Sequence, residues 1–183
     1  MKKCWSLCLI FFLFPSLLLA GPRNKFWKEN RDKIKEHRQE QSAENKEFRE
    51  SLEGISKEEK QEAIKEHREE QYAENKNFHQ EMHEDNMAYL KSRLANNNKL
   101  TDAEKEELIA FFESQYQENV SFRDTQHAEN VSFFETIAND ASMSKKEKQE
   151  AIRSHFKTQH RENKAYRQEQ KAEAKSKLKG LWK

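Results

Sequence analysis

Polar amides and aromatic residues recur together along this chain of 183 residues in one motif, Gln-x-x-Glu-Asn-x-x-(Phe/Tyr), called here the amide–aromatic motif. Two copies begin 11 residues after the previous copy, and 11 residues make three turns of an α-helix, so the marked positions lie on one helical face. The pattern therefore predicts long helices with an amide-rich inner face. The copies are Gln41–Phe48, Gln71–Phe78, Gln115–Phe122, Gln126–Phe133 and Gln159–Tyr166, with a looser copy at Met82–Tyr89.

Three short segments interrupt this periodicity. Each has an apolar residue, then Ser or Thr, and Glu three positions later, which is the composition of a helix capping box. The three pairs are Ser56 with Glu59, Thr101 with Glu104, and Ser144 with Glu147. Helix-stopping residues, such as Gly54, precede these segments. We therefore expect four helices, at about residues 24–52, 57–95, 102–138 and 145–179.

The connections between these helices are short, which makes sequential neighbours antiparallel. Charged residues make up 37% of the chain, but it has only 3 Gly and 2 Pro, so long solvated helices are favoured over disorder. We predict an all-α fold of four long antiparallel helices with mixed seven- and eleven-residue repeats. They would form an elongated bundle or helical hairpins within a single repetitive domain, residues 21–183.

The first twenty residues have the composition of a secretory signal peptide. Two lysines precede the apolar run Leu7–Leu19, and the small residue Ala20 follows it. This run is short for a bilayer span, so we expect no stable membrane anchor. Cleavage near Ala20 would remove both Cys4 and Cys8. A mature chain without disulfides is typical of a periplasmic or otherwise extracytoplasmic bacterial protein.

Charge and motif content exclude several function classes. Without the two lysines of the expected signal peptide, 32 basic residues face 33 acidic ones, a net charge of −1 that does not predict binding to nucleic acid. The sequence contains no nucleophile–base set, phosphate-binding loop or dinucleotide fingerprint. We therefore expect a binding protein without enzymatic activity and without a required cofactor.

The repeated amides allow two interpretations. A buried amide left unpaired costs about 1–3 kcal/mol, so these side chains need partners. They would either form a Gln–Asn ladder between helices or line a partly open amphipathic face that receives another protein. In the second case the motif aromatics would be the apolar anchors for unfolded or exported clients: Phe48, Phe78, Phe122, Phe133 and Tyr166.

Histidines and carboxylates suggest metal binding as an alternative. His79 and His83 stand four residues apart on one helical face, and His127 and His160 occupy the same register as His83 beside the motif. Asp124 precedes His127 by three residues. Such groups could ligate a divalent ion of Zn, Ni, Cu or Fe, or they could be ordinary solvated side chains. The motif glutamates form an acidic row that is either solvated or faces a mineral surface: Glu44, Glu74, Glu118, Glu129 and Glu162.

One segment carries a family resemblance. Leu100-Thr101-Asp102-Ala103-Glu104-Lys105 resembles the Leu-Thr-x-x-Gln motif of the Spy/CpxP-type periplasmic proteins. That resemblance implies a small, all-helical, cysteine-free stress protein, some relatives being ATP-independent chaperones and others binding zinc, nickel or copper. The chain departs from the family by having Glu in place of Gln and three units in place of two. Its His- and acid-rich helices are also similar in style to magnetosome proteins that contact iron oxide.

Three functional hypotheses follow from the sequence. The first is a Spy-like chaperone that holds clients on an amphipathic face. The second is binding of metal ions or of a mineral surface such as iron oxide through the His and Glu rows. The third is a structural coiled coil whose partner helix, including one from a homodimer, covers the same face.

Overall fold

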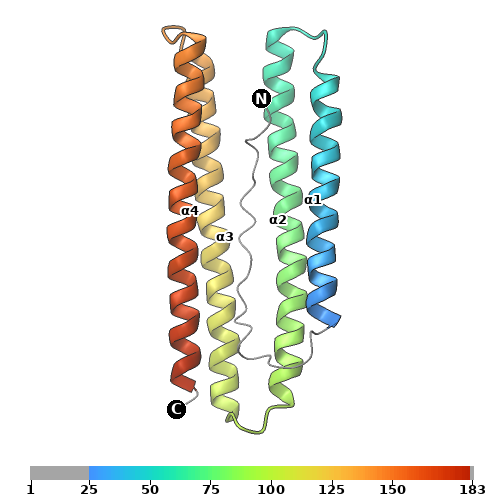
Figure 1. Cartoon of the computed structure of the whole chain (residues 1–183), viewed down its shortest axis with the longest axis vertical. Helices are drawn as coiled ribbons and strands as arrows, with labels where there is room; N and C mark the ends of the chain where they lie inside the picture. The colour runs from blue at the N-terminus through green and yellow to red at the C-terminus, as the bar shows by residue number, and fades with distance from the viewer. Residues whose placement is uncertain (1–24, 182–183) are drawn as a thin grey trace. The chain divides into compact units, whose positions relative to one another are not determined.

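The computed structural model describes residues 25–181, which form four α-helices (Figure 1). No strand occurs in this range, and every helix boundary lies within two residues of the predicted one, so the all-α prediction is confirmed. The expected signal peptide lies outside the described residues. No helix within residues 25–181 has a stretch long and apolar enough to cross a membrane. The helices are α1 (Lys25–Ser51), α2 (Lys57–Ala95), α3 (Asp102–Asn139) and α4 (Lys145–Leu181).

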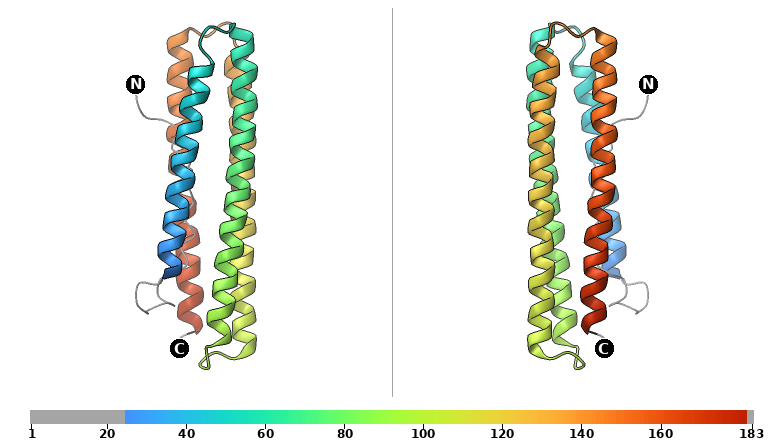
Figure 2. Two further views of the ribbon diagram at one scale, coloured as in Figure 1. Left: turned by 90° about the vertical axis from the view of Figure 1, so that its right-hand side faces the viewer. Right: turned by 90° about the vertical axis from the view of Figure 1, so that its left-hand side faces the viewer.

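The helices pair as two antiparallel hairpins. Helices α1 and α2 belong to one compact unit, and α3 and α4 belong to another. In Figures 1 and 2 the two helices of each hairpin run side by side. The helical hairpins allowed by the sequence are therefore present, while the expectation of one domain over residues 21–183 stays a prediction.

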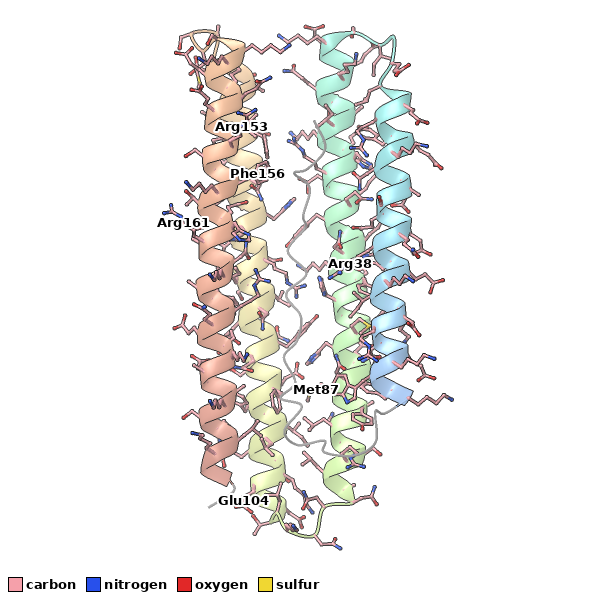
Figure 3. All side chains as sticks on the ribbon, in the orientation of Figure 1. Arg38, Met87, Glu104, Arg153, Phe156 and Arg161 are labelled. Atoms are coloured by element: carbon pink, nitrogen blue, oxygen red, sulfur yellow. The ribbon has the colours of Figure 1, made fainter. Side chains whose placement is uncertain are left out.

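Capping boxes begin the last three helices, as the sequence predicted. The N–H of Glu104 donates to the Thr101 hydroxyl over 3.3 Å, while the Thr101 N–H donates to the Glu104 carboxylate over 2.8 Å. These bonds hold the pKa of Glu104 below its usual value, because they stabilise the ionised carboxylate. Figure 3 shows Glu104 at the start of α3. The same reciprocal bonds join Ser56 with Glu59 and Ser144 with Glu147.

A glycine ends the turn between α1 and α2. Gly54 has a φ of 82°, in the left-handed region that residues with a Cβ rarely adopt. Because the helical path cannot continue through this conformation, the chain reverses within residues 52–56. This reversal sets which residues of α2 lie opposite those of α1.

Buried apolar side chains are concentrated at one end of the α3–α4 hairpin. They lie at the beginning of α3 and near the end of α4, which are adjacent in an antiparallel pair and far from the connecting loop. Leu108 is completely buried, and Phe112 and Leu178 are nearly so. Closer to the loop the buried positions are amides, including Gln159 and Asn163. The part of this hairpin near its loop therefore depends on polar contacts between the helices.

Candidate functional site

Two copies of the amide–aromatic motif face each other across the α1–α2 hairpin. The His37 ring of α1 stacks on Phe78 of α2, with ring centroids 4.0 Å apart and planes 9° apart. The His67 ring of α2 stacks on Phe48 of α1 at 3.8 Å and 14°. We call such a stacked pair, with one ring from each helix, a rung. In the first rung α1 supplies the histidine and α2 the phenylalanine, and in the second rung these contributions are reversed. This part of the hairpin therefore has an approximate local two-fold symmetry.

Each rung histidine also binds the asparagine of the opposite motif. His37 Nε2 lies 3.2 Å from Asn75 Oδ1, and His67 Nε2 lies 3.1 Å from Asn45 Oδ1. Each asparagine Nδ2 donates over 2.6 Å to the carbonyl four residues earlier in its own helix, which directs Oδ1 toward the histidine. Because an amide oxygen can only accept, the imidazole Nε2 carries the proton in these contacts.

The motif glutamines complete the polar layer between the rungs. Asn75 Nδ2 donates to Gln41 Oε1 over 3.0 Å, and Asn45 Nδ2 donates to Gln71 Oε1 over 3.1 Å. Gln71 Nε2 also donates to the Glu44 carboxylate over 2.8 Å. Its symmetry counterpart, Gln41 Nε2, is buried and has no hydrogen-bond partner among the described residues. The Gln–Asn ladder is therefore present in this hairpin, with one position unsatisfied.

The looser motif copy makes the same kind of contact further along α1 and α2. Phe26 stacks on Tyr89 with centroids 4.1 Å apart and planes 6° apart. Asn30 Nδ2 donates to Asn86 Oδ1 over 2.9 Å, and both side chains are buried.

An exposed ion pair lies beside these contacts. Lys33 Nζ donates to the Asp85 carboxylate over 2.6 Å. This hydrogen bond raises the pKa of Lys33, because it stabilises the ammonium form. The ion pair therefore lies at the exposed edge of the α1–α2 interface, where it helps to define the register of the two helices.

The α3–α4 hairpin contains a related but less symmetrical set of contacts. His155 of α4 stacks on Phe133 of α3 at 4.0 Å and 7°, and its Nε2 lies 2.7 Å from Asn130 Oδ1. The second rung has two motif aromatics, Phe122 and Tyr166, at 4.1 Å and 9°. Phe122 precedes the next motif glutamine by four residues, which is the position of histidine in the other hairpin.

The α3–α4 interface also contains buried polar groups that lack hydrogen-bond partners among the described residues, and burial shifts the pKa values of two of its residues. Burial raises the pKa of Tyr166 to about 12, and nearby carboxylates such as Glu118 act in the same direction. Desolvation lowers the pKa of His155, against the smaller opposing influence of Glu129 and Glu162. Several buried polar atoms have no hydrogen-bond partner among the described residues: Asn119 Oδ1, Gln126 Nε2, Tyr166 OH and Gln170 Oε1.

All five predicted client anchors lie in rungs. Each ring stacks on a ring of the partner helix and remains half-buried, so the closed hairpins do not present them as a free apolar surface. Their use in client binding stays a prediction, and it requires the two helices of a hairpin to separate. The five are Phe48, Phe78, Phe122, Phe133 and Tyr166.

The predicted metal ligands lie on three helices. His79 and His83 are buried one turn apart on α2, while His127 and Asp124 of α3 are half-buried and His160 of α4 is exposed. Within residues 25–181 no three or more His, Cys, Asp or Glu residues are grouped closely enough to hold a metal ion. Metal binding stays a prediction.

The motif glutamates are exposed and partly engaged in the hairpins. Glu44 accepts a hydrogen bond from Gln71, and Glu118 accepts one from Gln170 over 2.8 Å. These bonds give the motif Glu a role in pairing helices. Binding of a mineral surface by this row stays a prediction, and its other members are Glu74, Glu129 and Glu162.

Sequence interpretation missed the rung histidines. His37, His67 and His155 each precede a motif glutamine by four residues, so the motif extends to His-x-x-x-Gln-x-x-Glu-Asn-x-x-(Phe/Tyr). This spacing was a usable signal, because it places His on the same helical face as the Gln and Asn.

The fold and the rungs define this chain as an all-α protein with two helical hairpins, and amide and aromatic layers pair the two helices within each hairpin. Comparison with protein-family models finds no matching family, and comparisons with curated proteins and with solved structures find no match. The resemblance to the Spy/CpxP-type proteins stays a prediction.

Proposed function

We propose that this protein is a non-enzymatic, extracytoplasmic binding protein that holds unfolded polypeptides on the rung faces of its hairpins when these open. The observation that carries the proposal is the half-buried state of all five motif aromatics, each of which follows a motif asparagine by three residues on the same helical face. An interface of this kind contains both apolar anchors and hydrogen-bonding groups. Both are needed to hold a polypeptide whose side chains and backbone are exposed.

The energetics of the rungs support reversible opening. A stacked aromatic pair contributes about 0.5–1.5 kcal/mol beyond its buried area, and a typical intramolecular hydrogen bond contributes about 0.5–1.5 kcal/mol net. The layers near the hairpin loops consist of such contacts, so local separation costs less there than in a continuous apolar core.

The separated faces would have a defined chemistry. In the α1–α2 hairpin, opening exposes the Phe48 and Phe78 rings together with the amides of Asn45 and Asn75. The rings would contact apolar side chains of a client, and the amides would bond its unpaired backbone groups. Because few apolar rings are spaced along a polar face, a client would be held weakly and could fold after release.

The test compares an open and a locked form of the same protein. Residues 21–183 contain no cysteine, so new cysteines would be the only reactive thiols. Lys33→Cys with Asp85→Cys, and Glu107→Cys with Lys177→Cys, replace two ion pairs that each join the helices of one hairpin. A short bis-maleimide then links each pair, while the control carries a monofunctional maleimide at the same four sites.

Both forms are added without metal, near equimolar ratio, to a client that scatters light as it unfolds. The proposal predicts that the control suppresses scattering and that the cross-linked protein suppresses it several-fold less. Equal suppression by both forms would contradict the requirement for opening. Absence of suppression by both would contradict client binding itself.

A further inference from the structure

The contacts between α1 and α2 are distributed along the whole length over which the two helices pair. From the loop outward they comprise the rung of Phe48 with His67, the reciprocal amide layer, the rung of His37 with Phe78, and the pair Asn30 with Asn86. Every one of these contacts joins α1 to α2, so none depends on both helices belonging to one chain. An α2 helix from another copy would offer α1 the same partners in the same register.

We infer that the α1–α2 hairpin exchanges between two copies of this chain, so that α1 of each copy pairs with α2 of the other. The partner is a second copy of the chain because its α2 helix offers α1 every contact of the closed hairpin, including the outer contacts of Asn30 and Lys33. Pairing of α1 with a second α1 could repeat only the central layers, since Asn86 and Asp85 lie on α2. This inference is independent of client binding.

The connection between α1 and α2 is suited to act as the hinge. Gly54 holds its φ of 82° in the closed turn, and no atom outside Gly54 and its two chain neighbours lies within 4 Å of the position a Cβ would occupy there. A side chain at position 54 would therefore strain the closed turn through its backbone conformation and not through crowding. The Ser56 capping box starts α2 beyond this point, so exchange requires a change mainly in residues 52–55.

The α3–α4 connection is held more firmly. The Asp140 carboxylate accepts bonds from the Ser142 N–H over 2.8 Å and the Ser142 hydroxyl over 2.6 Å. Lys148 Nζ of α4 donates to the Ala138 carbonyl of α3 over 3.2 Å, which ties the two helices directly across the loop. This hairpin therefore serves as the internal control for exchange.

Charge reversal tests the exchange directly. Lys33→Glu and Asp85→Lys each place like charges opposite one another in a closed hairpin, because the native pair is in contact. In a mixed dimer whose two chains exchange α1, position 33 of each chain contacts position 85 of the other chain. Both of these contacts then join opposite charges. After unfolding and refolding together at low ionic strength, where exposed charges are least screened, mixed dimers should exceed the statistical half of all dimers in native mass spectrometry.

Monomers alone, or mixed dimers at the statistical half, would overturn the inference. The matched control is Glu107→Lys mixed with Lys177→Glu, which reverses the ion pair of the α3–α4 hairpin. That mixture should show no preference for mixed dimers. A preference as large as in the first mixture would contradict the assignment of exchange to α1–α2.

The hinge gives a second and separate readout. Gly54→Ala strains the closed turn, whereas Gly54→Asn introduces a residue that tolerates positive φ. We expect Gly54→Ala to tighten the dimer by about fivefold relative to Gly54→Asn in analytical ultracentrifugation. An equal dimer affinity for the two variants would overturn the role of the turn. Neither readout involves a client, so failure of exchange and failure of client binding are distinguishable.

Discussion

The imidazole of His37 lies flat against the ring of Phe78, with ring centroids 4.0 Å apart. The same imidazole is hydrogen-bonded to Asn75, which precedes Phe78 by three residues in one motif copy. One side chain of α1 therefore contacts two positions of the motif on α2. Since residues three apart share one face of a helix, this double contact fixes both the rotation and the register of α2 against α1.

Replacing Asn75 with Ala should destabilise the α1–α2 hairpin by about 1–3 kcal/mol, because it leaves His37 Nε2 and Gln41 Oε1 without their observed partner. The matched control is Asn77→Ala, two residues further along α2 and exposed, which has the same change in helix propensity. Urea unfolding followed by circular dichroism measures both variants. Equal unfolding free energies would show that the buried amide contacts contribute nothing.

Acidification should loosen the α3–α4 hairpin through His155. Desolvation lowers the pKa of His155 in the folded protein below its ordinary value of 6.5, so the unfolded chain takes up the proton more readily. The corresponding stability is fully present above about pH 6.5 and is lost as the pH falls through the folded pKa. Unfolding free energies measured between neutral pH and about pH 5 should show this loss.

The matched variants for this pH dependence are His155→Phe and His160→Phe. Phe at position 155 retains a ring to stack on Phe133 but cannot be protonated, so the acid-induced loss should become smaller. His160 is exposed on the same helix, and its replacement should keep the loss unchanged. An identical pH profile for wild type and His155→Phe would exclude His155 as the titrating group.

Tyr166 should ionise at an unusually high pH. Burial raises its pKa to about 12 from an ordinary value of 10.0, so the stability linked to its neutral form is complete below pH 10 and is lost as the pH rises toward 12. Ultraviolet absorbance of tyrosinate should resolve this late step among the 4 tyrosines of the chain. The step should be missing in Tyr166→Phe.

The same variant tests the buried hydroxyl. Tyr166 OH has no hydrogen-bond partner among the described residues, so its removal should raise the unfolding free energy by up to about 1–3 kcal/mol, the cost of an unpaired buried polar group. A late ionisation step that persists in Tyr166→Phe would assign the high pKa to another tyrosine. A large loss of stability would indicate that the hydroxyl is satisfied in solution.

Helix boundaries could be predicted from the sequence because their signals are local. The capping residues Ser56, Thr101 and Ser144 act within one helical turn of their partners, and the structure shows each of these caps. The eleven-residue spacing likewise identified the inner faces of the helices, since amides of the motif such as Asn75 and Asn163 are buried.

The partners of these faces could not be predicted with the same certainty. Which residue lies opposite Phe78 depends on the length and path of the turn around Gly54, and not on the sequence near Phe78. The four-residue spacing within one helix favours His79 and His83 as a metal pair. The contacts of His37 are across the hairpin, so spacing within one helix does not identify its partners.

Whether an individual amide has a hydrogen-bond partner depends on which side chain of the facing helix lies opposite it. The two hairpins contain nearly the same motif, yet Asn75 Oδ1 has a histidine partner and Asn119 Oδ1 has none among the described residues. The difference follows from the ring of the facing helix: Phe78 of the Asn75 motif stacks on His37, whereas Phe122 of the Asn119 motif stacks on Tyr166. No imidazole Nε2 is therefore contributed by that rung to Asn119.

The amide–aromatic motif pairs helices through its rungs. A double-mutant cycle on His37→Ala and Phe78→Ala measures this pairing most directly, with His37→Ala and Phe48→Ala as the control pair within one helix. We expect a coupling free energy of about 0.5–1.5 kcal/mol for the rung and additivity within about 0.5 kcal/mol for the control. Additive effects of His37→Ala and Phe78→Ala would contradict pairing through the rung.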